Sequence, residues 1–201
     1  MNLPNKISIT RICMIPVFVL AFFLDGILPF NYGIAAIIFA LAACTDFIDG
    51  HIARSRGLVT NLGKFLDPIA DKVLVATAML LLLTMKDTLF ALFGAEQAIV
   101  YIVSTLFICV ILARELIISA FRQIAAVNGV VMAADKLGKY KTTFQDIAVF
   151  VLIFAVDMPL AVGKIFAYIG FALFTVATVL TVWSGISYVL KNKQVFQDKK
   201  D

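Results

Sequence analysis

Four aspartates within one short stretch are the residues of this chain best suited to chemistry. Asp46 and Asp49 lie three residues apart, and Asp67 and Asp71 lie four apart. Residues at these spacings share one face of an α-helix, so each pair predicts two carboxylates that project together. Four clustered carboxylates repel one another and are costly near a membrane interior, so they must be neutralised. Either protonation, as in a proton relay, or bound divalent cations would achieve this.

The residues around the aspartates favour divalent cations and a phosphorylated substrate. Oxygen ligands alone select Mg²⁺ or Mn²⁺ over zinc, and two such ions balance the charge of four carboxylates. A pair of ions can bridge the attacking and leaving oxygens of a phosphoryl-type displacement. Gly50 and Ala53 leave room for a bulky diphosphate near the backbone, and Arg54 can bind its oxygens. An attacking alcohol would also need a carboxylate to take its proton.

The composition indicates which elements must hold these residues. Hydrophobic residues make up 62% of the 201 residues, charged residues make up 15%, and the mean hydropathy is +1.01. Ordinary globular domains have about 45–50% apolar and about 25% charged residues, and a domain of this length cannot bury such an excess. Three isolated cysteines, five prolines and eleven glycines exclude a disulfide scaffold, a collagen and a disordered chain. The chain is therefore expected to be an all-α polytopic membrane protein.

A membrane-spanning helix needs about 20 mostly apolar residues, and six segments meet this requirement. They cover residues 7–24, 32–54, 66–86, 95–123, 143–162 and 165–190. The two acidic pairs lie on either side of the short connection between the second and third segments. That connection makes these segments antiparallel neighbours, so the four carboxylates are expected to converge. Residues 1–190 thus predict a six-helix membrane domain that starts with a short interfacial segment over 1–10, and residues 191–201 predict a polar cytoplasmic tail.

The positions of the basic residues predict the orientation of the bundle. Only Lys86 and Lys164 lie in connections on one side. The basic residues of the other side are Lys6, Arg11, Arg54, Arg56, Lys64, Arg122, Lys136, Lys139, Lys141, Lys191, Lys193, Lys199 and Lys200. Basic connections face the cytoplasm, which places both termini and the acidic pairs on the cytoplasmic side of a cell membrane. The net charge of +4 then indicates contact with anionic lipid headgroups and not with nucleic acid. Trp183 and Tyr188 are expected at the membrane interface.

The whole pattern between the first and the last aspartate resembles a known family signature. It reads Asp46-x2-Asp49-Gly50-x2-Ala53-Arg54-x8-Gly63-x3-Asp67-x3-Asp71. It resembles the signature of the CDP-alcohol phosphatidyltransferases at every defining position. Residues 4–11 are similar to the N-terminal segment of that family. Residues 114–122 and 138–143 resemble the bacterial phosphatidylglycerophosphate synthases within it.

This resemblance implies a fold, a reaction and a set of site residues. The family fold is a six-helix bundle, usually a homodimer, with its site open to the cytoplasmic leaflet. The reaction transfers the phosphatidyl group of CDP-diacylglycerol to glycerol 3-phosphate, giving phosphatidylglycerophosphate and CMP. By likeness, Asp46, Asp49, Asp67 and Asp71 bind two divalent cations, Mg²⁺ or Mn²⁺, and Asp71 also acts as the general base. The donor-binding residues implied by the same likeness are Asn5, Ser8, Gly50, Ala53, Arg54 and Thr60.

The phosphate of the acceptor needs cations other than those that serve the donor. The candidates are Arg114, Arg122, Lys139 and Lys141. The two arginines are eight residues apart and project from similar faces of a helix, and the two lysines precede the fifth expected span. Two other interpretations stay open. Arg114 could instead form an internal ion pair with Glu115, and the lysines could simply anchor the chain at anionic headgroups.

Two other functions also stay open on the sequence alone. Another member of the same family would use inositol phosphate, serine or a neutral lipid alcohol as its acceptor, because the signature reports only the donor chemistry. A cation- or proton-coupled transporter would use the acidic cluster as its relay. Transporter folds commonly contain internal repeats and interrupted helices, and the sequence shows neither, so the transporter is the more distant alternative.

Overall fold

The structure is a computed structural model that describes residues 3–24, 27–55, 61–127 and 136–192. Within these ranges, the side chains that it leaves undescribed are those of residues 3–5, 46–55, 61–65, 67–68, 126–127 and 136. The described residues form six α-helices and one 3₁₀ helix, named η1. Their bounds are α1 Leu3–Phe22, α2 Asn31–Ser55, α3 Asn61–Thr84, η1 Phe90–Glu96, α4 Gln97–Val127, α5 Lys136–Ala155 and α6 Leu160–Lys191. The prediction of six helices is confirmed.

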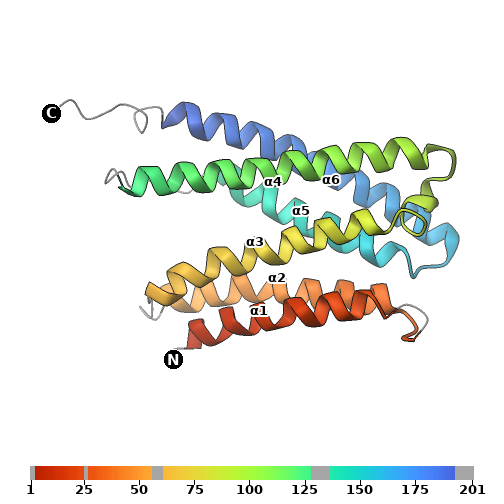
Figure 1. Cartoon of the computed structure of the whole chain (residues 1–201), viewed down its shortest axis with the longest axis horizontal. Coiled ribbons are helices and arrows are strands. Elements are labelled where there is room, and N and C mark those ends of the chain that lie inside the picture. The colour runs from red at the N-terminus through yellow and green to blue at the C-terminus, as the bar shows by residue number, and fades with distance from the viewer. Residues whose placement is uncertain (1–2, 25–26, 56–60, 128–135, 193–201) are drawn as a thin grey trace.

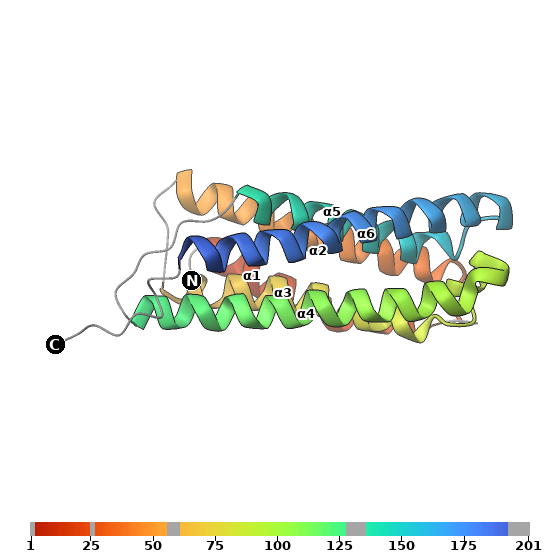
Figure 2. The same cartoon turned by 90° about the horizontal axis from the view of Figure 1, so that it is seen from above.

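The six helices run side by side along one axis and alternate in direction (Figure 1). The starts of α1, α3 and α5 and the ends of α2, α4 and α6 therefore lie toward one end of the bundle, as Figure 2 shows from a second side. We call this the motif end, because it carries the connection between α2 and α3, and we call the opposite one the far end. Helix α5 packs along α6 and α1 packs along α2, while α3 contacts α1, α2, α4 and α5.

The fifth helix differs from its predicted position. The apolar run predicts a span over 143–162, whereas α5 covers Lys136–Ala155 and α6 already begins at Leu160. Pro159 explains the difference, because proline disfavours a helical backbone at the residue before it and has no N–H to continue a helix. The helix boundary therefore falls before Pro159, and α5 takes its residues from the polar segment on its N-terminal side.

The two ends of the expected membrane domain also differ in detail. The interfacial segment expected over residues 1–10 is not a separate element, because α1 starts at Leu3 and continues without a break to Phe22. At the other end, Lys191 is the last residue of α6, so the expected tail over 191–201 starts inside a helix. Residues 193–201 of that tail lie outside the described residues.

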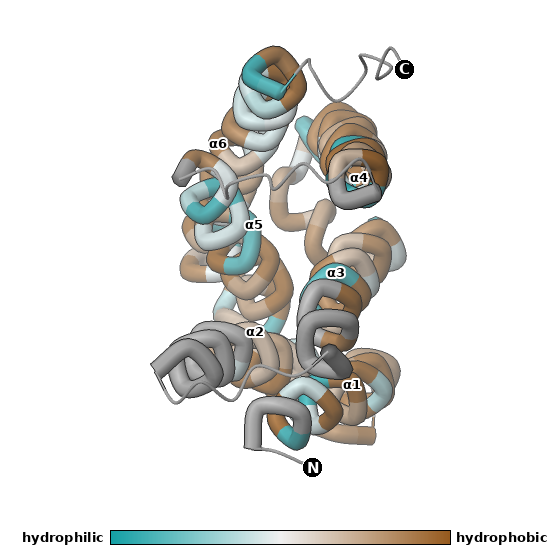
Figure 3. The backbone as a smooth tube through the Cα atoms, turned by 90° about the vertical axis from the view of Figure 1, so that its left-hand side faces the viewer, coloured by the Kyte–Doolittle hydropathy of each residue, from teal (hydrophilic) through white to brown (hydrophobic). Residues whose placement is uncertain are grey.

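Apolar side chains cover the outside of the bundle as well as its interior. Two of the described helices are long and apolar enough to cross a membrane, over Phe90–Ala125 and Leu160–Lys191. Every α-helix exposes large apolar side chains, and Figure 3 shows hydrophobic residues on the outer faces. Examples from α1 to α6 are Leu20, Leu41, Leu80, Leu106, Ile147 and Val179. Trp183 is 68% exposed, whereas Tyr188 is 4% exposed and packs against Phe121. The expected interfacial position is therefore wrong for Tyr188, which is a core residue.

Side-chain caps hold the helix ends together at the far end. The Asn31 amide donates from Nδ2 to the carbonyl of Phe22 at 3.0 Å and so caps the end of α1. The Gly33 N–H, in the first turn of α2, donates to Asp157 Oδ2 at 2.7 Å. Asp157 lies in the turn between α5 and α6, so this bond joins that turn to α2. Only glycine fits at residue 33, because a Cβ atom there would overlap the ring of Phe30.

We expect Asp157→Ala to lower stability, since the substitution removes both the acceptor for a helix-start N–H and a negative charge near that helix start. The expected loss of unfolding free energy is about 1–2 kcal/mol. Each kcal/mol lowers the melting temperature of a chain of this size by about 2–4 °C. Thermal unfolding in detergent measures it. Asp87→Ala is the matched control, because Asp87 is an exposed acid at the same end. Equal melting temperatures for the two variants would show that the contact to Gly33 contributes nothing.

Candidate functional site

The antiparallel pair α2–α3 carries both acidic pairs toward the motif end. Asp49 and Asp67 each lie six residues from the helix end that meets the connection, which is about 9 Å along the helix. Asp46 lies nine residues and Asp71 ten residues from those ends, about 5 Å further in. Because α2 and α3 are in contact, the four positions form two levels on neighbouring helices. The backbone thus allows the convergence that the spacing predicts.

Several predicted site residues lie outside the described part of the structure. Thr60 belongs to the connection between α2 and α3, which is not described. The side chains that are not described are those of Asn5, Asp46, Asp49, Gly50, Ala53, Arg54 and Asp67. Among the side chains that are described, no three His, Cys, Asp or Glu residues gather as a possible metal site. For the seven predicted site residues whose side chains are not described, the structure gives helix positions alone, and Thr60 lies outside the described residues.

Asp71 is the member of the acidic motif whose side chain is described. It is half-buried on α3. Its carboxylate interacts electrostatically with Lys72 and with Lys141 of α5. Such attraction is strong where water is scarce. The acidic motif therefore adjoins Lys141, a cation from a helix outside the α2–α3 pair.

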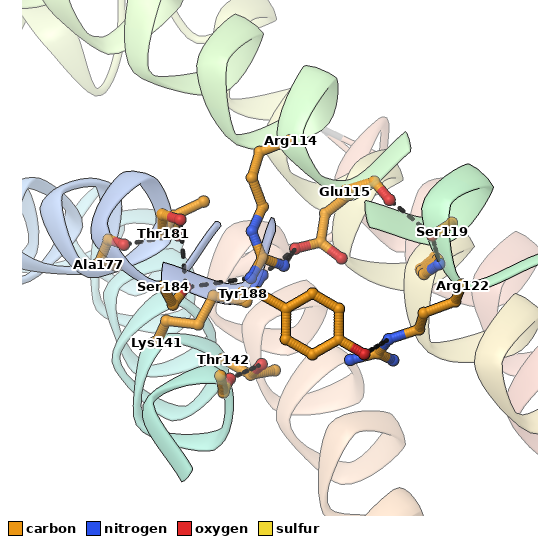
Figure 4. Close-up of polar contacts among 12 residues, drawn as sticks. Arg114, Glu115, Ser119, Arg122, Lys141, Thr142, Ala177, Thr181, Ser184 and Tyr188 are labelled. Carbon is orange, nitrogen blue, oxygen red and sulfur yellow. Dashed lines mark hydrogen bonds and ion pairs between the residues drawn. The ribbon is translucent and has the colours of Figure 1, made fainter. Parts of the chain in front are cut away.

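Three charged side chains meet between α4 and α5 (Figure 4). Glu115 Oε1 accepts a hydrogen bond from Arg114 Nη1 at 3.1 Å and another from Lys141 Nζ. Arg114 Nη2 also donates to Ser184 Oγ of α6 at 3.0 Å. Lys141 is buried, so its charge requires a counter-charge from within the bundle. The interpretation that Arg114 and Glu115 form an internal ion pair is confirmed, and Lys141 completes it.

A second set of contacts connects this cluster to α3. Ser119 Oγ donates to the backbone carbonyl of Glu115 at 2.6 Å, and Lys72 Nζ of α3 donates to Ser119 Oγ. A hydroxyl that gives its proton to a carbonyl keeps lone pairs for an ammonium group, so both bonds form together. We call this set of residues the polar network. It consists of Lys72, Arg114, Glu115, Ser119, Lys141 and Ser184, and it joins α3, α4, α5 and α6.

The four predicted acceptor cations are not all brought together. Arg122 donates from Nε to Tyr188 Oη at 3.2 Å and lies over that ring, 5.2 Å from its centroid. Arg114 and Arg122 thus both contact α6, as their spacing predicts. Lys139 is exposed while Lys141 is buried, because α5 already begins at residue 136. Side chains two residues apart on a helix point about 200° apart, so these lysines cannot share a face.

Helix α1 places another buried cation beside the acidic motif. Arg11 is fully buried, and its Nε donates to Thr45 Oγ1 of α2 at 3.1 Å. Thr45 directly precedes Asp46 along the chain. Ser8, a predicted donor-binding residue, is also fully buried, one turn before Arg11 on the same face. Arg11 is not among the predicted site residues, although an arginine inside an expected span is itself a signal of function.

Gln145 is a further polar residue at this site. It lies one helical turn after Lys141 on the same face of α5 and is 4% exposed. Within the described part of the chain, its amide oxygen has no hydrogen-bond partner. A buried acceptor without a donor is costly, so this oxygen is available to a donor other than the described residues.

Fold and site together define a class of protein: an apolar helical bundle in which an acidic helix pair adjoins buried cations. The sequence pattern of the CDP-alcohol phosphatidyltransferase family matches residues 1–183. The chain therefore belongs to the CDP-alcohol phosphatidyltransferases, which are membrane proteins.

Several curated relatives are similar over nearly their whole length. A Bacillus subtilis protein is 38% identical over an alignment that covers 95% of each chain. A Rickettsia bellii protein is 35% identical over 97% of each chain. A Shigella flexneri protein is 38% identical over 94% of this chain and 93% of its own. Each of these three relatives is named CDP-diacylglycerol–glycerol-3-phosphate 3-phosphatidyltransferase.

Proposed function

We propose that this chain transfers the phosphatidyl group of CDP-diacylglycerol to glycerol 3-phosphate, giving phosphatidylglycerophosphate and CMP. The observation that carries this proposal is the similarity to relatives of that name over 93–97% of their length. The uninterrupted signature between Asp46 and Asp71 supports the donor half of the reaction. The product belongs to phospholipid biosynthesis, in keeping with an apolar bundle that meets one substrate in the membrane.

The acidic pairs are proposed to hold two divalent cations, Mg²⁺ or Mn²⁺. The donor set fits such ions, since it consists of carboxylates alone and its four positions lie at two levels of neighbouring antiparallel helices. The residues that would hold the ions are Asp46, Asp49, Asp67 and Asp71. When bound, such ions shield the charge of the diphosphate and polarise the phosphorus–oxygen bonds.

In the proposed mechanism, Asp71 takes the proton of the attacking hydroxyl of glycerol 3-phosphate. The hydroxyl oxygen forms a bond to the β-phosphorus of CDP-diacylglycerol, and the bond from that phosphorus to the bridging oxygen breaks. CMP leaves with the electron pair of the broken bond. Arg54 would bind the diphosphate oxygens. The other residues proposed to bind the donor are Asn5, Ser8, Gly50, Ala53 and Thr60.

The phosphate of the acceptor is proposed to bind to the cations of α4 and α5. Arg114 and Lys141 come from two helices and meet at one carboxylate oxygen, which supports a single anion site. Arg122 lies further toward the motif end, where it can receive the incoming phosphate. Lys139 is exposed near the start of α5 and is assigned to the mouth of the site.

The bundle is proposed to lie in the cell membrane as a multi-pass homodimer, with its motif end toward the cytoplasm. The lysines and arginines near the helix ends at the motif end outnumber Lys86 and Lys164 at the far end, which supports this orientation. It would let glycerol 3-phosphate enter from the cytosol while the acyl chains of the donor stay in the bilayer. The homodimer is proposed from likeness to the family.

The test is an acceptor panel with the purified protein, CDP-diacylglycerol in mixed micelles and Mg²⁺. We expect CMP release with glycerol 3-phosphate and no comparable release with inositol phosphate, serine or a neutral lipid alcohol. Equal turnover with inositol phosphate would contradict the proposed acceptor and leave the family assignment intact.

A chelation arm in the same assay tests the proposed metal ions. Excess chelator should abolish CMP release, and added Mg²⁺ or Mn²⁺ should restore it, because four carboxylates need divalent neutralisation. Full activity in chelator would refute the two-ion site without affecting the acceptor result.

We expect Asp71→Asn to reduce turnover by about 10²–10⁴-fold, since a neutral amide cannot take a proton. Binding of CDP-diacylglycerol should change far less. Asp46→Asn and Asp67→Asn serve as comparisons and should instead raise the Mg²⁺ concentration needed for half-maximal activity. If Asp71→Asn kept more than about a tenth of the wild-type rate, Asp71 would not be the general base.

The two lysines of α5 should differ in their effect on the acceptor. Lys141→Met should raise the KM of glycerol 3-phosphate by about 10- to 150-fold, because it removes a charge-assisted contact of about 1.5–3 kcal/mol. Lys139→Met should raise it by about fivefold at most, as expected for an exposed charge. The KM of CDP-diacylglycerol should stay near the wild-type value in both variants. Equal effects on the acceptor would contradict the placement of the phosphate beside Lys141.

A further inference from the structure

We propose that Glu115 is a positioning residue that holds Arg114 and Lys141 as a pre-formed binding pair for a phosphate dianion. The identity of that anion as the phosphate of the acceptor rests on the proposed function. Glu115 itself bears the same charge as the ligand, so it acts through the two cations and not by touching the phosphate.

The contacts of Glu115 fix both cations at one point. A single carboxylate oxygen, Oε1, accepts hydrogen bonds from Arg114 of α4 and Lys141 of α5, which are far apart in sequence. Arg114 is held from a second side by Ser184 of α6, whose own hydroxyl donates to the carbonyl of Thr181 at 3.2 Å (Figure 4). The guanidinium group therefore has little freedom to turn, and Lys141 is brought to it.

The charged groups around Glu115 have a positive net charge, which favours the binding of an anion. Arg114 and Lys141 repel each other at short range, and Lys72 adds a third positive charge that also acts on Lys141. Asp71, Glu115 and Asp146 are the carboxylates that oppose them, and Arg122 adds a further positive charge that acts on Lys72. These four cations and three carboxylates have a net charge of +1, so the cluster keeps an excess of positive charge that attracts an anion. Glu115 thus offsets part of the repulsion between Arg114 and Lys141 without neutralising the whole cluster.

The exposure of the cluster distinguishes it from an ion pair that serves only to hold helices together. The side chain of Glu115 is 25% exposed, whereas that of Lys141 is 7% exposed. The helices therefore do not fully enclose the cluster, although Arg114 and Lys141 are mostly covered. A pair that contributes only to stability could be replaced by apolar side chains at little cost, so an ionic cluster that the helices leave partly open points to ligand binding.

The first test is Glu115→Gln, which keeps the shape of the side chain and removes its charge. Without that charge the two cations separate, and the acceptor must bring them together again when it binds. We expect the KM of glycerol 3-phosphate to rise at least about tenfold, as two charge-assisted hydrogen bonds become neutral ones. The kcat at saturating acceptor and the KM of CDP-diacylglycerol should stay near wild-type values. Glu115→Asp keeps the charge with a shorter reach and should give an intermediate KM.

A double-variant cycle separates positioning from general stability. If Glu115 acts through Lys141, adding Glu115→Gln to Lys141→Met should raise the acceptor KM by less than about threefold, because effects on residues in contact are not additive. A role in stability alone would give the same factor in both backgrounds. Glu96→Gln is the matched control, since the Glu96 carboxylate accepts a hydrogen bond from Tyr168 at the far end, at 3.3 Å, and should leave both KM values unchanged.

Calorimetric titration of inorganic phosphate into the wild type and the Glu115 variants gives a readout that needs no turnover. Weaker phosphate binding to Glu115→Gln, at an unchanged melting temperature, is the expected result. If Glu115→Gln fails to fold, Glu115→Asp carries the same comparison. Unchanged or tighter phosphate binding, or an equal rise in the KM of both substrates, would overturn the proposal. If the wild type did not use glycerol 3-phosphate as an acceptor but its phosphate binding still depended on Glu115, the proposed function would be refuted and this inference would stand.

Discussion

Charge buried among apolar helices must meet a polar partner inside the bundle, and the arrangement at the motif end depends on this requirement. A charged side chain that stays unpaired at membrane depth costs about 3 kcal/mol or more. The buried cations accordingly reach across to neighbouring helices: Arg11 of α1 to Thr45 of α2, and Lys141 of α5 to Glu115 of α4. Each such bond fixes the relative position of two helices. The polar contacts that compensate the charges therefore also shape the site.

Helix α3 connects the acidic and the basic halves of this site. Asp71 and Lys72 are consecutive residues on it, and consecutive residues of a helix point about 100° apart. Lys72 binds Ser119 of α4, whereas Asp71 belongs to the acidic motif that α3 shares with α2. The carboxylate of Asp71 still interacts with Lys141 across the bundle. On the proposed function, Asp71 would act as the base on the same small substrate whose phosphate Lys141 binds.

Much of the fold follows from local sequence, and the site follows from it only in part. Six apolar runs predict six helices, and the spacing of the aspartates predicts their levels on α2 and α3. The fifth span is misplaced because hydropathy extends across Pro159, whose effect on the backbone is steric. That shift also separates Lys139 from Lys141, since both lie within a helix and not in a connection. The bond between Lys141 and Glu115 spans 26 residues and that between Arg114 and Ser184 spans 70, so neither leaves a local pattern.

This difference between local and long-range contacts bears on how members of one family could differ in their acceptor. On the proposed function, the donor chemistry depends on a signature within two consecutive helices that are in contact. On the proposed function, the acceptor meets side chains of α4 and α5 that are brought together by packing against α6 and α3. Substitutions at Glu115 or Ser184 can alter the geometry of that anion site without touching any aspartate of the signature. On this proposal, the same two acidic pairs would serve different acceptors, because the residues proposed to bind the acceptor are held by other contacts.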